Sequence, residues 1–110
     1  MRVFPISGIA AGYEGLTTAT AVGFTSTVIA PTTGDFVGKK ARAAIISVEV
    51  ADIRFTINGT TPTLTAETAV GHLLEKGNYY EIKGEKNVEN FKCINAVNAS
   101  GALVKCTILF

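Results

Sequence analysis

Residues 41–57 read ARAAIISVEVADIRFTI, and this stretch decides the fold class. Apolar and polar residues alternate through it, as in a β-strand that buries one face. The apolar positions change parity part-way, from Ile46, Val48 and Val50 to Ile53, Phe55 and Ile57. Because strand side chains have a period of two, one residue must be absorbed between the two runs. We therefore expect a β-bulge, a tight turn or a corner between two sheets at Ala51-Asp52.

The rest of the chain has the composition of short strands joined by turns. Val, Ile, Thr, Phe and Tyr are abundant, and 11 glycines punctuate the sequence. Strand-like segments follow one another at residues 17–22, 24–30, 70–74 and 79–82, with turns at 31–35, 58–59 and 75–78. No segment has helical periodicity, and residues 85–90 are expected to form a polar turn in which Val88 is the anchor.

The C-terminal residues predict a hairpin, with a loop at 98–101 and a last strand at 102–110. If that loop is centred on Ala99 and Ser100, Cys93 lies directly opposite Cys106. A disulfide is conceivable there but strained. The interpretation we favour is two free thiols in the core, since disulfides are rare in proteins that stay in a cytoplasm.

Together these segments predict an all-β fold, an antiparallel β-sandwich or small barrel of jelly-roll or immunoglobulin-like type. Residues 1–16 are interrupted by glycines and are expected to form an N-terminal arm or edge segment, with a short edge strand at residues 2–6. Residues 17–110 are expected to form a single β-sandwich domain, which fits a chain of 110 residues.

Charge and hydropathy exclude several classes of function. The net charge is +1, which gives no electrostatic case for binding nucleic acid. No apolar run approaches the roughly 18 residues that span a bilayer, and the N-terminus does not resemble a signal peptide. We therefore expect neither a membrane nor a nucleic-acid partner, and synthesis in a cytoplasm. Charged residues make up only 17%, below the roughly 25% of an average domain, so we expect a partner to cover part of the surface.

Residues that could support catalysis are few and scattered. His72 is the one histidine, and it lies in an apolar run far in sequence from Cys93 and Cys106. The carboxylates occur singly, and no glycine-rich phosphate loop is present. We expect no enzyme activity, metal or cofactor; a small hydrolase that uses His72 is a distant alternative. Tyr13, Tyr79 and Tyr80 leave open a module that binds carbohydrate.

The last two-thirds of the chain resembles a pattern in small structural proteins of tailed bacteriophages. The matching elements occur in order as DIRFTINGTTPT at residues 52–63, VGHLL at 70–74, a turn at Gly77, a strand at 79–82, NFKCI at 90–94 and a final aromatic, Phe110. The order of these elements is distinctive, although each element is short. No catalytic residue is carried over by this resemblance.

The resemblance implies a virion protein made in the cytoplasm of a bacterial host. The role it implies is capsid decoration, in which the protein cements the major capsid shell as a homo-oligomer, with a trimer favoured. A neck or tail component, or an adhesion module that binds carbohydrate on the virion, is the alternative. Eight residues are our candidates for contacts with the major capsid protein or with neighbouring copies, namely Arg2, Val3, Phe4, Ile6, Tyr13, Lys39, Lys40 and Arg42.

Overall fold

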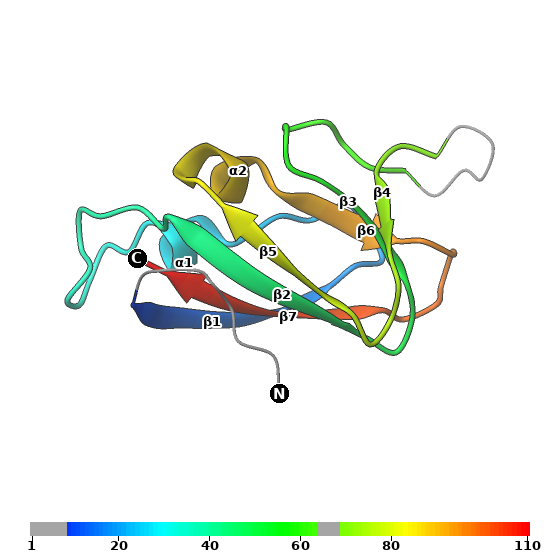
Figure 1. Ribbon diagram of the computed structural model, residues 1–110, viewed down its shortest axis with the longest axis horizontal. Coiled ribbons are helices and arrows are strands. Elements are labelled where there is room, and N and C mark those ends of the chain that lie inside the picture. Colours follow the sequence, from blue (N-terminus) through cyan, green and yellow to red (C-terminus); the bar gives the residue numbers. More distant parts are fainter. Residues whose placement is uncertain (1–8, 64–68) are drawn as a thin grey trace.

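The computed structural model describes residues 9–63 and 69–110 of the chain. This part contains seven strands and two short helices (Figure 1). In chain order these are β1 (Ala10–Thr17), α1 (Ser26–Ile29), β2 (Ala43–Glu49), β3 (Ile53–Thr56), β4 (His72–Leu74), β5 (Tyr79–Lys83), α2 (Glu85–Asn90), β6 (Lys92–Asn95) and β7 (Leu103–Leu109).

The strands form two antiparallel sheets, and this confirms the predicted all-β fold. The larger sheet has the order β1-β7-β2-β5, and the smaller has the order β4-β3-β6. Within the described residues, β2 and β7 are the central strands of the larger sheet and β3 is the central strand of the smaller. The two sheets face each other as the layers of a sandwich (Figure 1).

The change of parity at Ala51-Asp52 is a corner at which the chain passes from one sheet to the other. β2 ends at Glu49 in the larger sheet, and β3 begins at Ile53 in the smaller. The N–H of Ala51 donates to the carbonyl of Glu49 at 2.9 Å, which closes a tight bend around Val50. Of the three geometries that the sequence allowed, the chain uses the corner.

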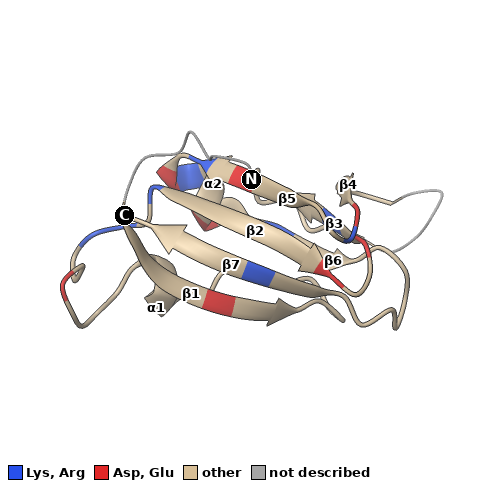
Figure 2. Cartoon of the chain, turned by 60° about the horizontal axis from the view of Figure 1, so that its bottom comes forward, with Lys and Arg blue, Asp and Glu red and all other residues tan. Residues whose placement is uncertain are grey.

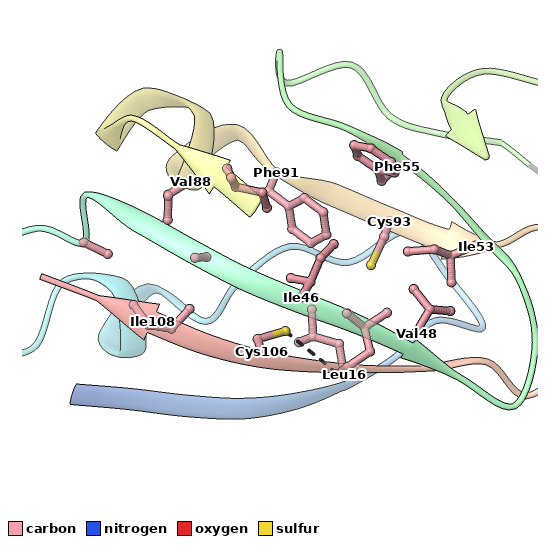
Figure 3. Close-up of a cluster of buried hydrophobic side chains, with 14 of the residues drawn as sticks. Leu16, Ile46, Val48, Ile53, Phe55, Val88, Phe91, Cys93, Cys106 and Ile108 are labelled. Carbon is pink, nitrogen blue, oxygen red and sulfur yellow. Dashed lines mark hydrogen bonds between the residues drawn. The ribbon is translucent and has the colours of Figure 1, made fainter. Parts of the chain in front are cut away.

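The core lies between the two sheets and receives side chains from both (Figure 3). Ile46 and Ile108 project from the larger sheet, Ile53 and Cys93 project from the smaller, and all four are fully buried. Burial of one such aliphatic side chain contributes about 1.5–3 kcal/mol to folding. The ring of Phe91, just before β6, extends this core toward other aromatic rings.

The N-terminal part of the described chain joins both sheets. β1 is an edge strand of the larger sheet, so the chain is already paired at residue 10, within the segment 1–16 that we expected to be an arm or edge segment. The short strand expected at residues 2–6 lies outside the described residues. After β1 the chain crosses to the smaller sheet, where Val22 and Cys93 exchange two backbone hydrogen bonds of 2.9 and 2.8 Å.

The predicted C-terminal hairpin is wrong, because β6 and β7 belong to different sheets. Cys93 lies opposite Phe55, and Cys106 lies opposite Ile46 and Glu14, so the two cysteines are not cross-strand neighbours. Two strands show the same alternation of apolar and polar residues whether they pair as a hairpin or lie in different sheets. What distinguishes them is which strands pair, and long-range contacts set that.

Three expectations about local structure also need correction. Residues 17–22, expected to be a strand, contain only the last residue of β1 and an isolated bridge at Val22. Ser26–Ile29 is a single helical turn where we expected strand, and Glu85–Asn90 is a short helix where we expected a turn. Helices of four and six residues are too short to show a 3.6-residue repeat. The expectation that Val88 anchors its segment is confirmed, since its side chain is 1% exposed.

The backbone is strained at Val50 in the corner, and substitution by glycine should remove the strain. Val50 has φ 75°, in the left-handed region, and its side chain is 61% exposed. A non-glycine residue there is strained by about 1–2 kcal/mol, whereas glycine costs about 0.5–1 kcal/mol in unfolded-chain entropy. We expect Val50→Gly to raise the free energy of unfolding by about 0.5–1 kcal/mol, measured by urea denaturation.

Val97→Gly is the matched control. Val97 is 66% exposed and is not among the residues with positive φ. The same substitution should therefore lower the free energy of unfolding there, by about 0.5–1 kcal/mol. An equal loss at both positions would contradict the strain at the corner.

Candidate functional site

The eight candidate contact residues do not form one cluster in the described structure. Arg2, Val3, Phe4 and Ile6 lie outside the described residues. Tyr13 is on β1 and is 64% exposed. Lys39, Lys40 and Arg42 are exposed on the segment that leads into β2, where the Nζ of Lys40 lies 3.8 Å from a carboxylate oxygen of Glu85. The structure therefore separates a tyrosine on one sheet edge from a basic segment beside α2.

The strands of the larger sheet carry few charged residues and are mostly tan in Figure 2. Side chains opposite one another share a face, so the ladder registers define the rows that point away from the core. The two central rows are Tyr13, Thr107, Ile45, Glu81 and Gly15, Lys105, Ser47, Tyr79. These rows contain Glu81 and Lys105, and the two flanking rows add Glu49 and Lys83. In one flanking row Ala43 and Leu109 are buried.

The outer edge of β1, which pairs with no other strand in residues 9–63 and 69–110, borders this face. Ile9 and Phe110 exchange two backbone hydrogen bonds, of 2.9 and 3.0 Å. Hydrogen-bonded pairs recur at every second residue along β7, and Phe110 is the first of them. Gly12, Glu14 and Leu16, which lie opposite Ile108, Cys106 and Val104, therefore direct their N–H and C=O groups toward β7. The residues between them, Tyr13, Gly15 and Thr17, direct theirs away from the sheet.

Glu14 is the one charged residue of β1, and it is held on the other face. The N–H of Thr25 donates to one carboxylate oxygen of Glu14 at 2.9 Å, and the Thr25 hydroxyl donates to the other at 2.7 Å. This charge is therefore turned away from the outer face. Sequence analysis identified Tyr13 but missed Gly15 and Thr17, because their role depends on the pairing of β1 with β7. The one available signal was the shared parity of residues 13, 15 and 17.

His72 and Cys93 are too far apart to act as a catalytic pair. Both lie opposite Phe55, one on each side of β3. Two inter-strand spacings amount to about 9–10 Å, whereas a base must come within about 3 Å of its nucleophile. The ring of His72 packs instead on Phe55, with centroids 5.6 Å apart. Cys106, in the other sheet, is buried.

Burial makes both thiols poor nucleophiles. It raises the pKa of the Cys93 thiol from 9.0 to about 12. The pKa of the Cys106 thiol is raised further, by burial first and then by the charges of Cys93 and Glu14. Both cysteines are free, and this confirms the favoured prediction of two core thiols (Figure 3). A nucleophilic cysteine needs a lowered pKa, so the shift runs against such a role.

Tyr79 and Tyr80 are neighbours at the other edge of the larger sheet. They line an open hollow of about 530 Å³ together with Ile57, Ile82 and polar side chains of β5 and α2. The ring of Tyr80 packs on Phe55, with centroids 4.8 Å apart, so this ring belongs to the core. The ladder register places Tyr79 on the outer face, where it is half-buried and its hydroxyl oxygen is buried. Of the two rings it is the one outside the core.

Neither a metal cluster nor a membrane-spanning helix is found in the described structure. In residues 9–63 and 69–110, no three His, Cys, Asp or Glu side chains gather to hold an ion. No helix in these ranges is long and apolar enough to cross a bilayer. Comparison of the chain with protein-family models, with curated proteins and with solved structures finds no match.

The raised thiol pKa values predict a pH dependence of stability. The folded protein favours the neutral thiols, so their contribution is complete below the unfolded pKa near 9.0 and is lost as the pH rises through the folded values. We expect the free energy of unfolding to fall above pH 9, by up to about 1.4 kcal/mol per pH unit for each thiol.

Cys93→Ala separates the contribution of the Cys93 thiol from that of the other groups that titrate at alkaline pH. The variant should show a shallower fall of the free energy of unfolding above pH 9, measured by urea denaturation at a series of pH values. Parallel curves for the wild type and the variant would show that Cys93 makes no such contribution.

Proposed function

We propose that the protein is a virion structural protein of a tailed bacteriophage, and that it decorates and cements the major capsid shell. The observation that carries the proposal is the outer edge of β1, which pairs with no other strand among the described residues and has the exposed Tyr13 beside it. This edge offers a partner backbone hydrogen bonds and the apolar surface of one exposed ring. In this proposal the protein performs no catalysis and needs no cofactor.

The segments that resemble phage proteins support the same proposal. Residues 52–63 contain β3 and the turn at Asn58-Gly59, where φ is 87° at Gly59. Residues 70–74 contain β4, which pairs with β3. The resembling elements therefore include two paired strands of the smaller sheet. We take them to form the framework that supports the larger sheet rather than the contact surface itself.

The proposed mechanism is additive burial of surface. Each copy would bridge neighbouring capsid subunits, and a standard interface buries about 1,200–2,000 Å². Repetition over many copies would add avidity, so modest individual contacts would stabilise the whole shell. The exposed lysines at residues 39 and 40, with Arg42, would contribute salt-dependent steering at the rim rather than most of the affinity.

Copy number on the particle is the decisive measurement. We expect quantitative mass spectrometry of purified virions to give a ratio to the major capsid protein near one, or a simple fraction of it. A dozen or fewer copies per particle would move the protein to the neck or tail. Its absence from particles would refute the virion role.

A carbohydrate-binding module on the virion is the second candidate function, because Tyr79 borders an open hollow with polar side chains. A glycan would stack on this ring and hydrogen-bond to groups such as Glu81 and Asn87. If the candidate is correct, Tyr79→Ala should abolish binding on a glycan array, whereas Tyr13→Ala, at the opposite edge of the sheet, should leave it unchanged. No glycan binding by the wild type would exclude the candidate.

A further inference from the structure

β1 is the least protected long edge among the described strands. Of the other edge strands, β6 is covered by Val22, β4 has three residues, and β5 carries Glu81 and Lys83. β1 has eight residues and no lysine or proline, and its single charge is held by Thr25. Natural sheets usually block such an edge, because an open one pairs with any available strand. An edge left open over this length is a docking site for a strand.

We propose that residues 2–6 of a second copy of this chain add to β1 as a fifth strand of the larger sheet. This inference names a partner for the edge used in the proposed function. That the contact forms on a virion rests on the proposed function. The segment reads RVFPI, which is apolar apart from its first residue. It would gain backbone hydrogen bonds from Tyr13, Gly15 and Thr17, in the manner of β-strand addition.

Pro5 fixes which residues of the segment can pair. Proline has no N–H, so in an added strand it must face away from the partner. Arg2, Phe4 and Ile6, which have the opposite parity, would then direct their backbone groups to β1. Residues directly opposite in a ladder share a face, so Phe4 would lie on the outer face beside Tyr13 or over Gly15. An aromatic ring over a strand glycine is a stabilising cross-strand contact.

A second copy is the occupant we propose, because the two-residue turn that would fold the segment back onto its own β1 is blocked at Ile9. A two-residue turn at Ser7-Gly8 would require Ile6 and Ile9 to exchange two hydrogen bonds. Both backbone groups of Ile9 are already bonded to Phe110. Donation from one copy to the next is a heterologous contact, and it closes into a ring when the rotation between copies allows. A ring of three would give the trimer favoured above.

Cross-linking of mixed variants that each carry one added cysteine tests the pairing on purified protein without particles. We expect Phe4→Cys mixed with Gly15→Cys, or with Tyr13→Cys, to give a disulfide-linked dimer of two different chains under mild oxidation. Lys83→Cys, on the opposite sheet edge, is the control and should not link to Phe4→Cys. The native thiols are buried in every sample.

The double variant Phe4→Cys/Gly15→Cys distinguishes the two possible origins of the segment. A link within one chain would show that the segment docks on its own β1 and would overturn the proposal. Links between chains support it. No link in any mixture would also overturn it.

A proline scan tests the predicted parity by sedimentation equilibrium, with each proline compared with alanine at the same position. Phe4→Pro and Ile6→Pro should weaken self-association about tenfold relative to Phe4→Ala and Ile6→Ala, because each removes a paired N–H. Val3→Pro should match Val3→Ala. Equal losses at all three positions, or a wild type that remains monomeric at every concentration, would refute the proposal. If the protein were absent from virions, its role in the shell would be refuted, whereas the evidence for strand addition between copies would be unaffected.

Discussion

β2 and β3 are consecutive along the chain but belong to different sheets, and the rest of the structure depends on this step. The corner at residues 50–52 turns the apolar face of β3 toward that of β2, so that Ile46 and Ile53 enter the same core. A single sheet with one apolar face would leave that face in water. Positive φ at Val50, which costs backbone energy, is the local consequence of a connection made this short.

Once the two faces meet, both cysteine thiols lie in the core. Cys93 and Cys106 enter the core from opposite sheets, and burial keeps both thiols protonated. His72 remains at the edge of the smaller sheet, against Phe55. What the fold presents to the outside is therefore a sheet face and a sheet edge. These features suit contact with another protein chain better than they suit chemistry on a small molecule.

The two edges of the larger sheet differ in a way that bears on assembly. β5 presents charged side chains and borders a hollow, whereas β1 presents Tyr13 and small residues. Within the described residues, β1 is the more open of the two edges. If a strand adds there, as proposed, the contact would be directional and head-to-tail. If such contacts close into a ring, no further open edge of this kind is left in the described part of the molecule.

The sequence by itself determined the all-β class, a strand within residues 41–50, the interruption of the pattern at Ala51-Asp52 and the anchor at Val88, but not that the interruption is a corner between sheets. Each follows from the period of apolar residues, which is a local property. Only the tertiary structure decided that β6 and β7 lie in different sheets, and that residues 10–17 pair with β7. Strand pairing joins residues far apart in the chain, and the alternation within a strand is the same whichever neighbour it has. The candidate edge therefore became visible only when β1 had β7 on one side and, among the described residues, no strand on the other.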